Sequence, residues 1–313
     1  MVSQKIEQDL NRIRAKHLAR ISLCHFDADG DEDWVTINGT PVNLNDEDHI
    51  GLPKELRDWI SKNLKTGDDK RRGGEGAAVE KRSSIKECQT HQELSKHLKE
   101  EYGIEVDPGI RKWYENGGYK VVREAMSDFE NILDEFPEIK GFYKTIKDNG
   151  GRAVMSSRFD GVLAFNTQKI SSVDVFQSLC EEGSRRKWWP KNMTPSAMLV
   201  HECAHALVNI ITEKETGISR SSDDFGNEHK KYLIPEKIIE EANKSIKATS
   251  YGKSKNILSH INSVSGYVDS LDGYGKKCSE AVAEALADCY TNQEKANPFS
   301  IEIKRALIRR LRG

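Results

Sequence analysis

The stretch TPSAMLVHECAHALVNII, residues 194–211, decides how the rest of the chain is interpreted. Thr194 can cap a helix, and Pro195 fits the first helical turn, where a missing N–H costs nothing. The residues that follow form the most apolar helix in the sequence, and such a helix is normally buried. It nevertheless carries three ionisable side chains: His201, Glu202 and His205. The stretch therefore predicts a core helix that buries ionisable side chains inside the protein.

These three residues spell HExxH, a spacing that favours a metal site. Positions i and i+4 share one helix face, so the imidazoles of His201 and His205 can reach one ion. Glu202 is close enough to act on a metal-bound water without ligating the metal. Chance produces this pattern in roughly one such chain in fifty. The alternative is a core helix whose histidines bond to other groups, but burying them unpaired would be costly.

Two histidines are too few for a stable zinc site, so a third ligand is needed. Val208 and Ile211 stand where the longer motif HExxHxxGxxH requires glycine and histidine. A second helix, CSEAVAEALADCY at 278–290, instead repeats carboxylates every four residues: Glu280, Glu284 and Asp288. Aligned carboxylates repel one another, and a cation facing them removes that repulsion. The alternative is a solvated acidic face on a surface helix.

HECAH followed by GYGKKCSEAVAEALAD (273–288) resembles the gluzincin-type zinc metallopeptidase domain typified by anthrax lethal factor and by domains of phage-associated HExxH proteins. The resemblance implies a Zn²⁺ cofactor and a zincin-like fold. It also implies the site residues: His201, His205 and Glu280 as zinc ligands, Glu202 as general base, and Glu284 as a second carboxylate that orients a ligand histidine.

In that family a tyrosine–glycine pair precedes the carboxylates and the tyrosine stabilises the oxyanion. The matching residue is Tyr274, which is one residue closer to Glu280 than in the family pattern. Tyr267, in SGYVDS, is therefore the alternative. The long separation between His205 and Glu280 implies an additional helical excursion at about 214–262.

The chain divides by composition. TGDDKRRGGEGAAVEKRSS, residues 66–84, has mixed charge and little to bury, which predicts a linker. It separates a small N-terminal region, 1–65, from a zincin-like metallopeptidase domain, 85–313. In the first region we expect helices at 5–21 and 53–64. WVTINGTPVNL, residues 34–44, predicts a hairpin that turns at Asn38-Gly39, and it is similar to a short hairpin of phage head-morphogenesis and minor-capsid proteins.

The larger domain is predicted to be predominantly helical α+β with a small sheet. The expected helices are 90–101, 118–134, 138–148, 173–181, 195–213, 235–248, 253–263, 279–292 and 299–312. The expected strands are RAVMSS (152–157) and GVLAFNT (161–167). We expect the free edge of GVLAFN to align an extended peptide by strand addition.

Composition excludes several classes of protein. The 313 residues include 48 basic and 50 acidic ones, so the net charge of −2 argues against a nucleic-acid partner. The sequence contains no apolar run of about 20 residues, so it predicts no membrane span, and no secretory signal is visible. None of the six cysteines forms a CxxC pair with another, and so few cysteines in a long chain without a secretory signal indicate reduced thiols. The predicted location is the bacterial cytoplasm or the virion.

Other residues receive structural interpretations. His229 and His260 are predicted to be solvated, and Asp288 to be a surface acid. FDADGDEDW (26–34) is interpreted as an acidic loop because it lacks the twelfth-position glutamate of a calcium loop. The pair Trp188-Trp189 either walls the cleft or packs beneath it.

The sequence thus predicts a zinc-dependent endopeptidase, encoded by a phage or prophage, that hydrolyses protein or peptide substrates through a metal-activated water. The alternative is a phage head-morphogenesis or structural protein that binds capsid proteins and uses a zincin fold as a scaffold without proteolysis. The intact Glu202 favours chemistry, because a structural site has no need of it.

Overall fold

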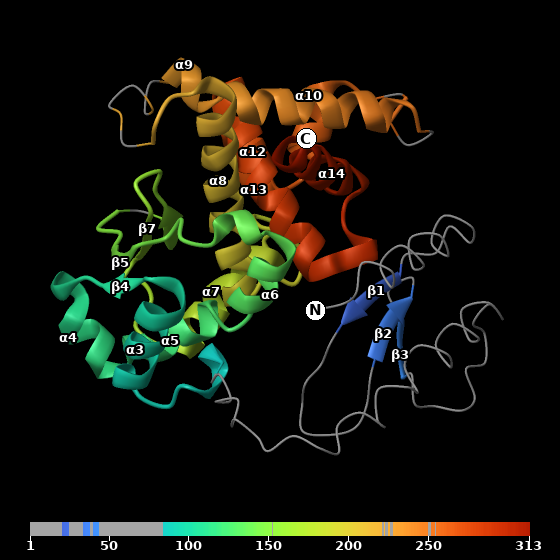
Figure 1. Cartoon of the computed structure of the whole chain (residues 1–313). Helices are drawn as coiled ribbons and strands as arrows, with labels where there is room; N and C mark the ends of the chain where they lie inside the picture. Colours follow the sequence, from blue (N-terminus) through green and yellow to red (C-terminus); the bar gives the residue numbers. More distant parts are fainter. Residues whose placement is uncertain are drawn as a thin grey trace. The chain divides into compact units, whose positions relative to one another are not determined.

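The computed structural model describes the strands at 21–24, 34–37 and 40–43, and residues 84–313 except 152, 221, 223–224, 226–227, 250–251 and 254 (Figure 1). Of residues 228 and 229, as of the three strands, only the backbone is described. The chain divides into two compact units, Met1–Lys81 and Arg82–Gly313.

The first unit contains a three-stranded antiparallel sheet in the order β1-β2-β3. Its strands are β1 (Ile21–Cys24), β2 (Trp34–Ile37) and β3 (Thr40–Asn43). Ile37 pairs with Thr40 across two residues, so the hairpin predicted at 34–44 is confirmed. The sequence pattern did not predict strand β1. The helices predicted at 5–21 and 53–64, the acidic loop and the linker lie almost wholly outside the described residues.

The second unit is mostly helical with a small mixed sheet, which confirms the predicted α+β class. The longer helices are α3 (His91–Tyr102), α7 (Val173–Arg185), α8 (Pro195–Thr216), α10 (Leu233–Lys247), α13 (Tyr274–Asn292) and α14 (Pro298–Arg312). The shorter ones are α4 (Arg111–Trp113), α5 (Tyr119–Ala125), α6 (Phe129–Glu135), α9 (Glu228–Lys231), α11 (Ile257–Asn262) and α12 (Gly266–Ser270). The strands are β4 (Glu105–Val106), β5 (Thr145–Asp148), β6 (Met155–Ser157) and β7 (Val162–Phe165).

The four strands lie in the order β4-β5-β7-β6, with β6 antiparallel to β7 and the other pairs parallel. The β6–β7 turn depends on Gly161, whose φ is +84° and whose added Cβ would lie 2.5 Å from the Phe142 carbonyl oxygen. The prediction that GVLAFN offers a free edge is wrong, because β7 is paired on both sides. Among the described strands, the edges of this sheet are β4 and β6, and β6 is the edge beside α8.

The prediction of a helix at 138–148 is also wrong. Ile139, Phe142 and Ile146 have helical spacing, and all three are buried. The chain instead makes a 3-10 turn at Pro137–Ile139 and then enters β5. Gly141 between them adopts a φ of +76°, which a helix does not allow. Pairing of β5 with β4 and β7 outweighs the local helical pattern, because the sheet buries Ile146 completely.

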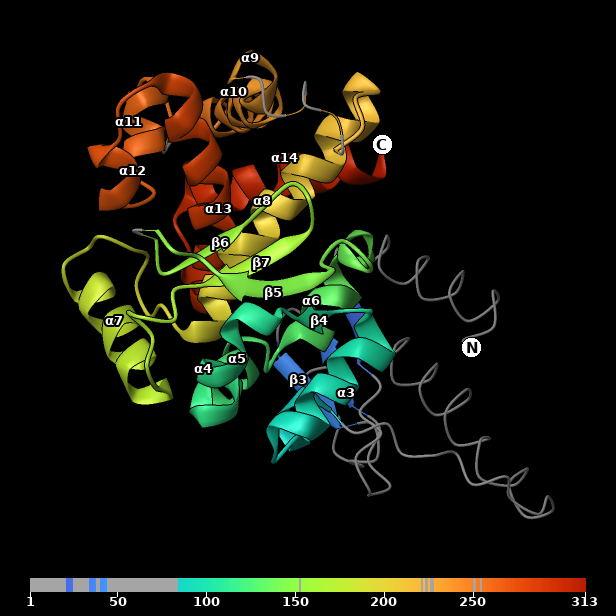
Figure 2. The same cartoon turned by 90° about the vertical axis from the view of Figure 1, so that its left-hand side faces the viewer.

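Helix α8 is the central element, as its sequence predicts. The Thr194 hydroxyl accepts a hydrogen bond from the Ala197 backbone at 3.1 Å and caps the helix, which ends at Gly217 in a left-handed conformation. In Figure 2 the strands follow one another as β6, β7, β5 and β4, and α8 runs beside β6. Helices α10–α14 lie beyond α8, away from β4.

Two predicted surface residues are buried. Asp288 is 6% exposed and accepts hydrogen bonds from the Asn297 backbone and the Asn292 amide, each at 2.8 Å. It is not a surface acid, because the turn between α13 and α14 needs an acceptor there. His260 is fully buried and its ring lies 5.1 Å from that of Phe299, so it is not solvated. The side chain of His229 lies outside the described part.

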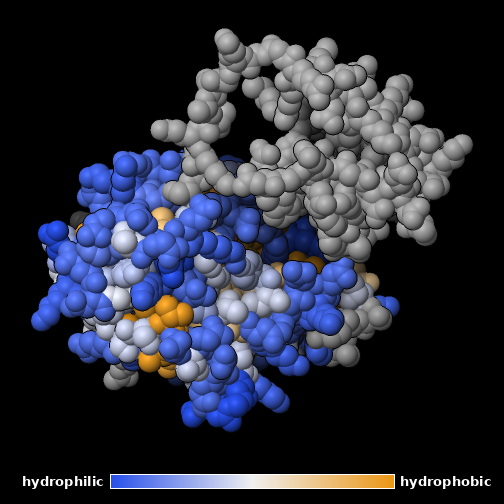
Figure 3. Space-filling view, turned by 90° about the horizontal axis from the view of Figure 1, so that it is seen from below, coloured by the Kyte–Doolittle hydropathy of each residue, from blue (hydrophilic) through white to orange (hydrophobic). Residues whose placement is uncertain are grey.

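The face of the second unit drawn in Figure 3 is largely hydrophilic, with a small apolar area on it. This agrees with a content of 31% charged residues. Within the described part of the chain, no helix combines the length and the apolar character that crossing a membrane requires.

We expect Asp288→Ala to lower the free energy of unfolding by about 1–3 kcal/mol, because the partly buried Asn297 N–H loses its partner. Urea denaturation of the metal-free protein measures the change. The matched control is Asp272→Ala, which removes an exposed carboxylate and should change stability by less than about 0.5 kcal/mol. An equally small effect at Asp288 would show that this turn does not depend on it.

Candidate functional site

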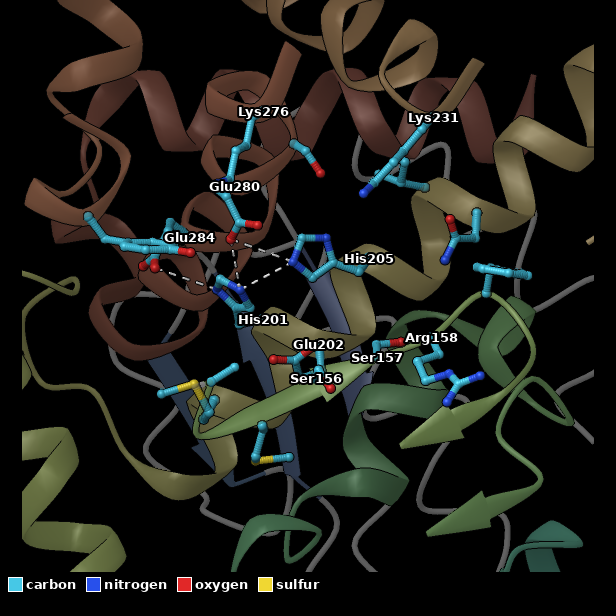
Figure 4. Close-up of a pocket in the computed structure, with 18 of the residues that line it drawn as sticks. Ser156, Ser157, Arg158, His201, Glu202, His205, Lys231, Lys276, Glu280 and Glu284 are labelled. Carbon is cyan, nitrogen blue, oxygen red and sulfur yellow. Dashed lines mark hydrogen bonds and ion pairs between the residues drawn. The ribbon is translucent and has the colours of Figure 1, made fainter. Parts of the chain in front are cut away.

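Helices α8 and α13 bring the two histidines and one of the predicted carboxylates to a single point (Figure 4). His201 Nε2 lies 3.4 Å from a carboxylate oxygen of Glu280, and His205 Nε2 lies 3.7 Å from the same atom. The two Nε2 atoms are 3.3 Å apart. Within the described residues this is the group of histidine, cysteine or acidic side chains whose spacing could hold a metal ion.

The spacing of these three atoms fits zinc. A tetrahedral Zn²⁺ with bonds of about 2.0–2.2 Å requires neighbouring ligand atoms to be about 3.3–3.6 Å apart. The three observed separations, 3.3, 3.4 and 3.7 Å, differ from that range by no more than about a tenth of an ångström. The donor set of two imidazoles and one carboxylate is one that zinc accepts.

Glu284 lies behind the cluster, as the resemblance implies for a carboxylate that orients a ligand. It is fully buried, and its Oε1 lies 3.6 Å from His201 Nδ1, the nitrogen that faces away from His205. A carboxylate there fixes the orientation of the imidazole. Burial raises the pKa of Glu284 to about 8, although His201 opposes the rise.

The ionisation of the cluster follows from mutual pairing. Burial on its own would raise the pKa of Glu280, but His205 and His201 together outweigh it and hold that pKa well below the usual range. Burial alone would lower the pKa of His201, but hydrogen bonding to Glu280 and the charges of Glu284 and Glu202 outweigh it and raise the pKa to about 9. In the metal-free protein these carboxylates therefore favour the protonated form of His201.

Glu202 is only 4% exposed and extends from α8 toward β6 (Figure 4). Burial raises its pKa, opposed by His201, His205 and a hydrogen bond from the Ser157 backbone. Ser157 is in turn held by Tyr143, which donates to its hydroxyl at 3.1 Å. The sequence analysis did not single out Ser157 or Tyr143, since neither belongs to a motif.

The two candidate tyrosines occupy different places. Tyr267 lines the cavity beside the cluster, and its backbone N–H donates to the Trp188 carbonyl at 2.9 Å. Tyr274 is not among the cavity-lining residues, and burial, together with Cys278 and the acids of α10, raises its pKa. Glu280 follows Tyr274 by six helical positions, a rotation of about 240° that turns the Tyr274 side chain away. The structure therefore brings Tyr267, and not Tyr274, to the site.

A cavity of about 740 Å³ opens over the cluster. It is lined by β6 and its turn, by α8, α12 and α13, and by both Trp188 and Trp189. The tryptophans therefore wall the cavity, and Trp188 is 44% exposed. Lys231, Tyr232 and Lys276 also line it, and sequence analysis missed all three. The position of Lys276 was predictable from the sequence, because this residue precedes Glu280 by four residues and so lies on the same helix face.

No family model, curated protein or solved structure matches this chain. Inferences about the site therefore depend on its own geometry, and the resemblance to gluzincins stays a prediction. That geometry combines three groups spaced for a metal, a buried carboxylate at their side, and an accessible cavity with a free strand edge.

We expect His201 in the metal-free protein to titrate with a pKa of about 9, measured by NMR of labelled histidine. Because this folded-state pKa is raised above 6.5, the pairing stabilises the protein fully below pH 6.5 and is lost as the pH rises through 9. In Glu280→Gln the pKa of His201 should fall, because burial lowers that pKa and the variant removes one of the carboxylates that raise it.

His260 serves as an internal comparison. Burial lowers its pKa below 6.5, so its resonance should shift at lower pH than that of His201 and should not respond to Glu280→Gln. A His201 pKa below 6.5 would contradict the proposed pairing in the metal-free state.

Proposed function

We propose that this protein is a zinc-dependent endopeptidase of the gluzincin type. The observation that carries the proposal is the cluster in which His201, His205 and Glu280 present three ligand atoms 3.3–3.7 Å apart, with Glu202 beside them. His201, His205 and Glu280 would hold the metal. A bound Zn²⁺ supplies a Lewis acid that polarises a carbonyl and lowers the pKa of a coordinated water toward neutrality.

Glu202 acts as general base. It accepts the proton of the water that attacks the scissile carbonyl and passes it to the leaving amine. Burial suits Glu202 to this task, because a raised pKa brings a carboxylate closer to working pH. The Ser157 backbone holds the carboxylate at the edge of β6, between the cluster and the peptide.

Tyr267 takes the role that the resemblance implied for Tyr274. Its hydroxyl stabilises the oxyanion that develops on the attacked carbonyl. The pairing of its backbone with Trp188 holds α12 against the cavity wall, and Gly266 permits this approach because a Cβ there would lie 2.6 Å from the Lys187 carbonyl oxygen.

The free edge of β6 aligns the substrate. Arg158 and Val154 direct their backbone groups to β7, as the hydrogen bonds from Arg158 N to Val162 O and from Asn166 N to Val154 O demonstrate. Backbone groups alternate in direction along an antiparallel strand, so Met155 and Ser157 face away from β7. The Ser157 N–H already bonds Glu202, which leaves the Ser157 carbonyl and both backbone groups of Met155 for an extended peptide that adds as a further strand.

A purely structural site is the competing explanation. Structural zinc is usually held by four protein ligands in a closed site, whereas the cluster here has three and faces a cavity of about 740 Å³. This favours catalysis. The phage origin and the capsid partners remain part of the proposal, supported by the hairpin at Trp34–Asn43.

We expect Glu280→Ala to lose bound zinc, because two imidazoles alone form an incomplete site. Elemental analysis of the purified protein measures this. The matched control is Glu294→Ala, which removes an exposed carboxylate outside the cavity and should retain zinc at the wild-type level. Full zinc occupancy in Glu280→Ala would refute its assignment as a ligand.

We expect Glu202→Gln to retain zinc and lower kcat by about 10²–10⁴-fold, the contribution of a general base. The measurement is cleavage of a fluorogenic peptide library by zinc-loaded protein, with a chelator arm that should abolish activity. If zinc-loaded wild-type protein cleaves no peptide yet co-purifies with capsids, the scaffold function replaces the peptidase.

A further inference from the structure

Two lysines stand together on the wall of the cavity opposite β6. Lys231 ends α9 and Lys276 lies in the first turns of α13, and both line the cavity. Figure 4 places them on the same side, above His205 and Glu280. Forty-four residues separate them in the sequence, so only the fold makes them neighbours.

A close contact joins the segments that carry the two lysines. Their neighbours Tyr232 and Gly275 touch, and a Cβ added at Gly275 would lie 2.7 Å from Tyr232 Cβ. Only glycine permits this approach of α13. Lys231 also lies over the Tyr232 ring, 5.3 Å from its centroid. Lys231 and Lys276 are thus each next in sequence to a residue of one close contact between Tyr232 and Gly275.

The cavity itself supplies these lysines with no free carboxylate. Its described lining contains three acids, Glu202, Glu280 and Glu284. Glu280 and Glu284 lie within 3.7 Å of the histidines, and Glu202 is directed at β6. Lys276 precedes Glu280 by one helical turn, yet Glu280 faces the histidines instead. Among the side chains that the structure describes, neither lysine has a carboxylate partner.

The third cation of the lining is already paired. Arg158, on the β6 side, forms an ion pair of 2.7 Å with Asp160. Among the described lining residues, positive charge without a carboxylate partner is therefore confined to the wall formed by α9 and α13. Glu236 of α10 lies against Gly275 behind that wall and is not among the residues that line the cavity. A bound dication would offset two of the three carboxylates, so the cavity would remain positive on that wall. Charged walls of a cleft concentrate ligands of opposite sign.

We propose that Lys231 and Lys276 select peptides that carry an acidic side chain next to the scissile bond. The inference rests on the proposed peptidase function and names its substrate class. A peptide aligned along β6 has its backbone between Glu202 and the lysine wall, and its side chains alternate between the two directions. A glutamate or aspartate directed at that wall meets two ammonium groups, whereas a lysine or arginine is repelled.

The test compares three terminally blocked peptide libraries, identical except that the residues flanking the scissile bond are Glu, Gln or Lys. We expect zinc-loaded wild-type protein to cleave the Glu library with a kcat/KM about tenfold above the Lys library, a magnitude set by exposed, salt-screened charges. Lys231→Glu and the double variant Lys231→Glu/Lys276→Glu should abolish or invert this preference.

Lys112→Glu is the matched control, because it makes the same charge change on α4, outside the cavity; it should keep the wild-type preference. Zinc content of each variant is measured, since Lys276 lies near Glu280. The single variant at Lys231 remains informative if the double variant loses metal. Equal cleavage of the Glu and Lys libraries, or faster cleavage of the Lys library, overturns the inference.

Peptide binding separates this inference from the proposed function. Zinc-loaded Glu202→Gln is titrated with fluorescent Glu and Lys peptides at low and high salt. Preferential binding of the Glu peptide that weakens with salt supports the lysine wall, even if wild-type protein cleaves nothing and the peptidase proposal fails. Equal binding of both peptides, with cleavage intact, contradicts the lysine wall alone.

Discussion

The second unit depends on a set of ionisable side chains buried between α8 and α13. Two imidazoles and two carboxylates lie on the facing sides of these helices, and moving an ion out of water costs several kcal/mol unless it is paired. Here the pairing is reciprocal, since His201 contacts both Glu280 and Glu284. Loss of one partner would leave the others buried without compensation. The two helices must therefore meet in one register.

The remaining architecture maintains that register and gives the cluster access to solvent. The apolar flanks of α8 bury it on nearly every side, while α14 packs on α10 and α13. Asp288 fixes the turn from α13 into α14. On the opposite side β6 leaves its edge unpaired among the described strands, so Glu202 lies between a polar cluster and a strand edge. A buried charge centre and an accessible backbone edge are thus combined in one cavity.

Local patterns predicted the elements whose sequence agrees with their environment. Helix α8 and the hairpin of β6 and β7 were predictable because capping, apolar content and turn residues all favoured them. The segment at 138–148 was not, because its helical spacing competes with a sheet formed by strands distant in the sequence. His260 and Asp288 were wrongly predicted to be exposed for a similar reason, because polar neighbours in the sequence do not show which helix packs over a residue.

The sequence by itself determined the chemistry of the centre. HExxH and the carboxylate repeat specify which atoms share a helix face, and a single helix guarantees that geometry. Tertiary structure alone decided everything that requires two elements to meet. It paired Glu280 with the histidines, brought Tyr267 to the cavity in place of Tyr274, and made β6 the free edge. It also placed Lys231 beside Lys276, because contacts between distant segments depend on packing, which no local pattern encodes.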